Sequence, residues 1–185
     1  MEFTEILQYV KTPVTVAHVL AVVLGMGAAL TSDILFSFFS KDKELNATEI
    51  STLSILAKIV SYGLILIALS GIIIFLSSPE YYLNSAKFLA KMSILLVLIF
   101  NGYVLNKYIW PHLLNKDFFT SEKERGTRRL AFVCGAISVV SWLSVCTLGV
   151  LNSLNMAYGL IMGIYLSIIC FGSIVALLVE RKELN

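Results

Sequence analysis

The sequence predicts an all-α integral membrane protein, a bundle of five transmembrane helices in a single domain. Hydrophobic residues make up 58% of the 185 residues and charged residues only 14%. The mean hydropathy of +0.86 lies well outside the usage of soluble proteins. The apolar residues also form five runs that are long enough to cross the hydrocarbon core as helices. These runs occupy residues 13–40, 52–77, 86–109, 130–150 and 157–179.

The first run, PVTVAHVLAVVLGMGAALTSDILFSFFS, begins at Pro13, a residue that suits the first turn of a helix. It carries two polar residues that are unusual in a span, His18 and Asp33. At about 100° per residue, both lie near the helix face that holds Gly25 and Ala29. The helix rise separates His18 from Asp33 by about 22 Å, so we assign them to two different sites.

The next two runs end in proline and aromatic residues. The second run is rich in Ile and Leu and is stopped by Pro79, with Tyr81 and Tyr82 placed for an aromatic belt at the interface. The third run ends in YIWPH, where Tyr108 and Trp110 form the corresponding belt on the other side. These two spans are therefore predicted to cross the bilayer in opposite directions.

A basic loop over residues 110–129 leads to the fourth run, and within it TSEKE offers Thr120 or Ser121 as an N-cap for a charged extension of that helix. A short turn then leads to the fifth run. Ten Lys and Arg residues lie on the side of the basic loop, against three on the other side. The ten are Lys41, Lys43, Lys107, Lys116, Lys123, Arg125, Arg128, Arg129, Arg181 and Lys182, and the three are Lys11, Lys87 and Lys91.

The positive-inside rule places the side with ten basic residues in the cytoplasm. We therefore expect a multi-pass protein of the bacterial inner membrane, with the N-terminus outside and the C-terminus in the cytoplasm.

Depth along the helices predicts a cluster of candidate ligands in the outer leaflet. His18 lies five residues inside the outer end of its span, and Lys91, Met92 and Met162 lie at comparable depths on the third and fifth spans. Histidine and methionine are ligands of haem iron. His18 is therefore a candidate haem or metal ligand, with a proton shuttle or a hydrogen bond to a neighbouring helix as the alternatives.

Small residues recur at four-residue spacing, as at Gly25 and Ala29 in the first span and at Gly159 and Gly163 in the fifth. Such faces let helix backbones approach closely. They also offer a surface for a homodimer, and Gly25 and Ala29 offer a flat wall for a porphyrin.

Asp33 and Lys58 form the second candidate site. Asp33 lies about 10 Å from the inner end of the first span, and Lys58 lies at about the same height on the second. A lone charge at that depth costs at least ~2.5 kcal/mol, so we expect the two to form an ion pair. The pair is either a proton or ion relay or a clamp that holds the two helices together.

Two segments resemble known families. AHVLAVVLGMGAAL, at 17–30, is similar to the first helix of the copper-resistance D family and of the HemJ-type protoporphyrinogen oxidases. FLAKMSILLVLIFNGYVLNKYIWPHL, at 88–113, resembles their helix with an LAK motif, an apolar run, Asn and Pro. The chain also resembles a broad group of small five-span bacterial membrane proteins. The resemblance implies a helical bundle in which His18 and Lys91 work near a b-type haem or copper.

The leading functional hypothesis is binding of b-type haem, or of copper, near the outer leaflet for electron transfer or redox chemistry, with His18 as metal ligand and Met92 or Lys91 opposite. The alternatives are a small proton-coupled transporter that uses Asp33 and Lys58, or an assembly subunit without chemistry. The sequence contains no CxxC, HExxH or phosphate-loop motif, so soluble enzyme chemistry has no support. The expected partners are the lipid bilayer and a second copy of the chain, and nothing predicts binding to nucleic acid.

Overall fold

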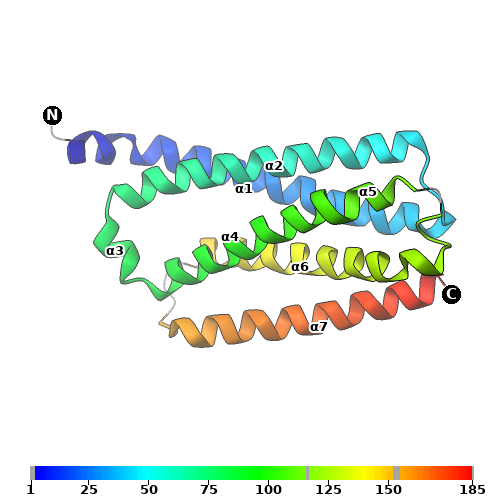
Figure 1. Cartoon of the computed structure of the whole chain (residues 1–185). Coiled ribbons are helices and arrows are strands. Elements are labelled where there is room, and N and C mark those ends of the chain that lie inside the picture. The colour runs from blue at the N-terminus through cyan, green and yellow to red at the C-terminus, as the bar shows by residue number, and fades with distance from the viewer. Residues whose placement is uncertain (1–2, 116, 152–154, 185) are drawn as a thin grey trace.

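The computed structural model describes residues 3–115, 117–151 and 155–184, and these residues form the all-α bundle that the sequence predicts (Figure 1). The long helices are α1 (Phe3–Phe39), α2 (Ala47–Leu76), α4 (Ala86–Val104), α6 (Arg125–Val150) and α7 (Tyr158–Leu184). The short ones are η1 (Ser40–Asp42), α3 (Pro79–Leu83), η2 (Leu105–Ile109), α5 (Trp110–Leu113) and η3 (Glu122–Glu124).

Five segments of the described chain are long and apolar enough to cross a membrane. They are Leu7–Asp42, Ala47–Leu76, Ala86–Leu113, Glu122–Val150 and Tyr158–Lys182. Large apolar side chains cover their outer faces, with Ile34, Leu96 and Phe171 among the most exposed. Apolar surface on this scale is stable in lipid and not in water. The chain is therefore a multi-pass helical membrane protein.

The long helices run side by side, with the N-terminus and the C-terminus at opposite ends (Figure 1). α1 packs along α2, α6 packs along α7, and α4 lies on α6. We call the end that holds η1, α5 and the start of α6 the basic end, because Lys41, Arg125 and Arg181 lie there. The orientation predicted from the basic residues would place this end in the cytoplasm.

α1 is longer than the predicted first span. The sequence predicts a start at Pro13, whereas α1 begins at Phe3 and continues through Pro13. A proline removes one backbone donor and crowds the preceding turn, but transmembrane helices tolerate it where other groups satisfy the freed backbone. The Thr15 hydroxyl donates to the Lys11 carbonyl (2.8 Å) in the turn around the proline. Pro13 therefore lies inside α1 and not in its first turn, because one proline does not end a helix whose flanking turns are intact.

α2 begins at Ala47, before the predicted start at residue 52, because a capping box precedes it. The Asn46 side chain accepts hydrogen bonds from the backbone N–H groups of Thr48 (2.9 Å) and Glu49 (3.0 Å). The Glu49 carboxylate accepts the backbone N–H of Asn46 (2.8 Å) in return. These bonds satisfy backbone donors that would otherwise lack partners at a helix start.

The segment 110–129 is largely helical and not a single loop. Apart from residue 116, which lies outside the described residues, it contains α5, η3 and the first turn of α6, which begins at Arg125 and not at 130. Ser121 caps η3 by accepting the backbone N–H of Lys123 (3.2 Å), as predicted from TSEKE. α7 likewise continues beyond residue 179 to Leu184. Hydropathy identifies only the apolar part of a helix, so it does not predict terminal turns that carry charged residues.

The third span changes its helical geometry near its basic end. α4 passes into the π-helical turn η2, where the Trp110 N–H donates to the Leu105 carbonyl five residues earlier. Pro111 follows directly, and it has no N–H of its own and crowds the preceding turn. A π turn accommodates this disturbance by widening the helix.

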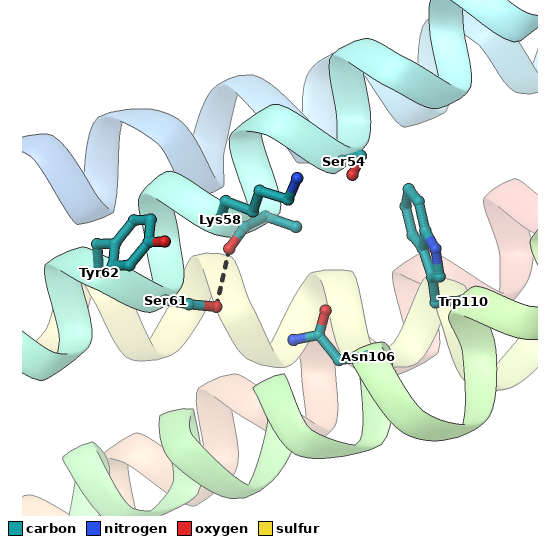
Figure 2. A pocket seen from close by; sticks show the side chains of 7 residues that line it. Ser54, Lys58, Ser61, Tyr62, Asn106 and Trp110 are labelled. Atoms are coloured by element: carbon teal, nitrogen blue, oxygen red, sulfur yellow. Dashed lines mark hydrogen bonds between the residues drawn. The ribbon is translucent and has the colours of Figure 1, made fainter.

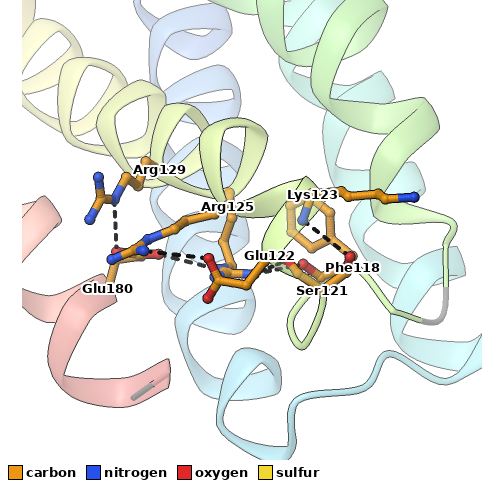
Figure 3. A network of polar contacts seen from close by, with 8 residues as sticks. Phe118, Ser121, Glu122, Lys123, Arg125, Arg129 and Glu180 are labelled. Carbon is orange, nitrogen blue, oxygen red and sulfur yellow. Dashed lines mark hydrogen bonds and ion pairs between the residues drawn. The ribbon is translucent and has the colours of Figure 1, made fainter.

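A buried network ties the basic end together (Figure 3). Arg128 of α6 donates from Nε to Glu180 of α7 (3.2 Å) and from Nη1 to the carbonyls of Phe118 (3.0 Å) and Ser121 (3.4 Å). Arg129 pairs with the other carboxylate oxygen of Glu180 (3.6 Å). The network fixes the segment before η3 against the ends of α6 and α7.

Candidate functional site

Asp33 lies on the face of α1 that meets α6. A Cβ atom placed on Gly135 would lie 3.4 Å from Asp33 Oδ1, and Ser138 follows about one turn further along α6. The second oxygen, Oδ2, is buried and has no hydrogen-bond partner among the described residues. Buried polar atoms are nearly always paired, and ionisable groups inside a membrane are rare and usually functional. Asp33 is therefore the first candidate residue.

The close approach that brings Asp33 to α6 depends on glycine. A Cβ on Gly25 would lie 2.9 Å from Cη2 of Trp142, and a Cβ on Gly63 of α2 would lie 2.9 Å from the Cα of Gly25. Both distances are shorter than real Cβ contacts, so glycine alone fits without a shift. Ala29 is 5% exposed and belongs to the same apolar cluster as Trp142. The small residues therefore pack helix against helix.

The same contacts decide whether a porphyrin could lie flat against Gly25 and Ala29, as the haem hypothesis expects. Trp142 and Gly63 cover the space in front of Gly25, where a porphyrin would have to lie. The residues present therefore do not fit a porphyrin against Gly25 and Ala29. No group of three or more His, Cys, Asp or Glu side chains suited to a metal ion occurs within the described ranges.

Asp33 and Lys58 do not form the predicted ion pair. Ion pairs between described side chains include His112–Glu124, Arg125–Glu122, Arg128–Glu180 and Arg129–Glu180, and none joins Asp33 to Lys58. Asp33 contacts α6, whereas Lys58 is exposed on α2 and lines a separate cleft. The helix rise predicts that the two residues share a height, but it does not predict that their side chains face each other.

A cavity of about 790 Å³ lies between the helices beside Asp33. Side chains from α1, α2, the third span, α6 and α7 line it, and most are aliphatic or aromatic. Its polar lining includes Ser32, Asp33, Ser37, Ser61, Asn106 and Ser138. Along α2 the lining extends from Leu53 to Ala68, a rise of about 22 Å. A large apolar cavity with a few polar groups is typical of a site for a small molecule.

A smaller cleft of about 300 Å³ adjoins this cavity (Figure 2). It is lined by Ser54, Ala57, Lys58, Ser61 and Tyr62 of α2 and by Asn106 and Trp110 of the third span. Four of these residues, Ala57, Ser61, Asn106 and Trp110, also line the larger cavity. The cleft and the cavity therefore share a wall.

His18 lies at the interface between α1 and α2. Its Nδ1 is hydrogen-bonded to the Ser70 hydroxyl (2.9 Å), and its Cε1 lies 3.6 Å from the position of a Cβ on Gly71. The contacts observed for His18 correspond to the helix-to-helix hydrogen bond, one of the alternatives that the sequence left open.

The two methionines of the predicted cluster have other surroundings. Met162 packs against the apolar cluster of Ile94, Ile161 and Tyr165. Met92 is 43% exposed on α4. The contacts observed for His18 are those with Ser70 and Gly71, and they involve neither methionine.

Sequence reasoning missed the cavity, the cleft and the role of Trp110 in their common wall. The nearest signal was YIWPH, because a proline after a long apolar run predicts a local change in helix geometry.

Taken together, these features define a multi-pass helical membrane protein whose bundle holds an apolar cavity with one carboxylate in its wall. Comparisons with protein-family models, curated proteins and solved structures found no significant match to the chain.

Proposed function

We propose that this protein is a small proton-coupled carrier whose substrate occupies the interhelical cavity. The observation that supports the proposal is the buried Oδ2 of Asp33, which has no partner among the described residues and belongs to the wall of the cavity. The proposal keeps the transporter hypothesis from the sequence, but it gives Asp33 and Lys58 separate roles and does not pair their charges.

The chemistry of Asp33 suggests how a proton would be coupled to a substrate. A carboxylate in an apolar site is unfavourable unless a proton, a cation or a hydrogen-bond donor accompanies it. A substrate that displaces water from the cavity increases that cost. Substrate binding therefore favours the protonated carboxyl, and this linkage is what a proton-driven carrier requires.

The substrate path would lie between α2 and the third span. α2 packs chiefly on α1, so its other side is available to the cavity. The π-helical turn η2 borders the cavity through Leu105, Asn106 and Ile109. Single π turns inside α-helices often occur at functional sites.

Gly102 provides a direct test of the cavity. It lines the cavity, and no atom lies within 4 Å of the position of its Cβ, so Gly102→Leu would fill the space without a clash at Cβ. Gly159 is equally open but lies outside the cavity, so Gly159→Leu is the matched control. Native mass spectrometry of protein released from nanodiscs should detect a bound small molecule in the wild type and in Gly159→Leu, but not in Gly102→Leu.

The role of Asp33 requires a second measurement. Proteoliposomes with an entrapped pH-sensitive dye, supplied with the molecule that mass spectrometry detects, should show proton movement down an imposed pH gradient for the wild type and a loss of that movement in Asp33→Asn. The proposal would be refuted if Gly102→Leu retained the same bound molecule as the wild type and Asp33→Asn left proton movement unchanged.

A further inference from the structure

The cleft beside Lys58 has the composition of an anion site. Lys58 supplies a positive charge, and no carboxylate is among the described residues that line the cleft. Ser54, Tyr62 and Trp110 add three hydrogen-bond donors, and no partner is recorded for any of them in the described chain. A phosphate group offers three strongly accepting oxygens, which suits one ammonium and several neutral donors.

The other two polar side chains of the cleft already donate to their own helices. The Ser61 hydroxyl donates to the Ala57 carbonyl (2.9 Å), as Figure 2 shows, and the Asn106 amide donates to the Gly102 carbonyl (2.9 Å). The unused donors are therefore those of α2 and Trp110 that surround Lys58.

The position of Lys58 indicates where the anion would come from. Lys58 lies about 16 Å along α2 from its start at Ala47, and its side chain extends toward Ser54, in the direction of the basic end (Figure 2). Lysine side chains within a span commonly extend toward the lipid headgroups in this way. An anion held by Lys58 would therefore belong to the leaflet at the basic end.

We propose that the cleft binds the phosphate of an anionic amphiphile and that the larger cavity takes its acyl chain. This inference rests on the proposed function, because it names the class of substrate for the same cavity. Ala57, Ser61, Asn106 and Trp110 line both the cleft and the cavity, so a head group in the cleft and a chain in the cavity would lie against the same four residues. The cavity lining extends along about 22 Å of α2 and is mostly apolar, as an acyl chain requires.

The charges are consistent with a carrier. The positive Lys58 balances a phosphate head in its singly charged form, which a phosphate monoester adopts below its second pKa of about 6, and Asp33 adds no charge while it holds a proton. The occupied site is then neutral overall, which avoids the cost of an unbalanced charge in the membrane. Proton uptake by Asp33 therefore favours occupation of the cavity by this class of substrate.

Two lysolipids with the same brominated acyl chain test the proposal in phosphatidylcholine nanodiscs. Lysophosphatidate carries an anionic head, and lysophosphatidylcholine carries a zwitterionic one. Bromine in the chain quenches tryptophan fluorescence at short range, and the protein has two tryptophans. Trp110 lines the cavity whereas Trp142 is 2% exposed in the core, so most of the quenching should come from Trp110.

We expect lysophosphatidate to bind more tightly than lysophosphatidylcholine, and Lys58→Gln to weaken lysophosphatidate binding about tenfold or more. Lys107→Gln removes a positive charge from the same end outside the cleft, and it should leave both affinities unchanged. Gly102→Leu should weaken the binding of both lysolipids, whereas Gly159→Leu should not.

The outcomes separate this inference from the proposed function. The phosphate assignment would be overturned if the two lysolipids bound equally well and Lys58→Gln left their binding unchanged. The cavity proposal would still stand if Gly102→Leu abolished that binding. If inorganic phosphate competes fully and Gly102→Leu has no effect, the cleft takes a free anion and the acyl-chain assignment is overturned. If neither lysolipid binds at all, the amphiphile assignment is overturned, and the mass spectrometry of Gly102→Leu together with the proton movement of Asp33→Asn decides the proposed function.

Discussion

The carboxylate of Asp33 packs directly on the backbone of Gly135, with Oδ1 at 3.4 Å from the position that a Cβ would occupy. The substitution Gly135→Ala therefore fits at ordinary contact distance but places a methyl group against the carboxylate. We expect proton movement in proteoliposomes to fall severalfold while the protein remains folded. Gly149→Ala is the control on the same helix, because Gly149 lies outside the cavity and its methyl would meet no atom within 4 Å, and it should leave proton movement unchanged. Equal effects from both substitutions would contradict a special role for the Asp33 contact.

His18 should contribute to stability through its hydrogen bond with Ser70 (2.9 Å). Hydrogen bonds between transmembrane helices contribute about 0.6 kcal/mol on average, so His18→Ala and Ser70→Ala should each lower the unfolding free energy by roughly that amount or somewhat more. The double variant should cost less than the sum, because both substitutions remove the same bond. Thermal unfolding in detergent measures these differences.

The absorption spectrum of the same variants distinguishes the haem hypothesis. Since the residues around Gly25 do not fit a porphyrin, we expect no Soret band from the purified wild type. A Soret band that His18→Ala removes and Ser70→Ala retains would instead support His18 as a haem ligand.

The contact between Gly63 and Gly25 predicts a sharp difference between two glycine substitutions. A Cβ on Gly63 would lie 2.9 Å from the Cα of Gly25, which is backbone and cannot rotate away. Gly63→Ala should therefore lower stability by about 1–3 kcal/mol, as overpacked cores do. Gly102→Ala meets no atom within 4 Å and should be neutral, or stabilise by up to about 1 kcal/mol through helix propensity. Equal melting temperatures would mean that α1 and α2 separate easily at this point.

The number and type of the helices could be predicted from the sequence, because five long apolar runs leave few alternatives in a bilayer. The start of α4 at Ala86 and the end of α6 at Val150 agree with the predicted 86 and 150. The polar ends of helices could not be predicted from hydropathy, since they depend on local bonds such as the capping box of Asn46. Pro13 misled the prediction because it usually marks a first turn and here lies inside a helix.

The candidate site was harder to predict. Asp33 was singled out as an ionisable residue in a span, but its neighbour was assigned by depth alone. Its contact with Gly135 depends on the rotation of α1 about its axis and on the close packing at Gly25. The cavity depends on side chains from five spans, which no pattern along one helix can place together. A single sequence therefore indicated the polar residue and not its surroundings.

The buried pair of Arg128 and Glu180 supplies the last prediction (Figure 3). Their side chains are 7% and 4% exposed, and both would be left without their main partner by a single substitution. Breaking a buried pair in this way typically costs about 3–5 kcal/mol, so Glu180→Gln and Arg128→Met should each lower the melting temperature strongly. Replacing both residues, as in Arg128→Met with Glu180→Leu, should cost much less than the sum, because no buried charge remains opposite an apolar group.

The neighbouring pair of Arg125 and Glu122 is the natural control. Its atoms lie 3.4 Å apart, but the side chains are 45% and 83% exposed, so Arg125→Gln should change stability by no more than about 1 kcal/mol. Added salt should reduce that small contribution and leave the Arg128 and Glu180 pair nearly unchanged, because water and ions screen exposed charges far more than buried ones. The double variant at Arg128 and Glu180 could instead lose as much stability as the two single variants lose together. That result would show that each side chain acts through other contacts, such as the Phe118 and Ser121 carbonyls for Arg128.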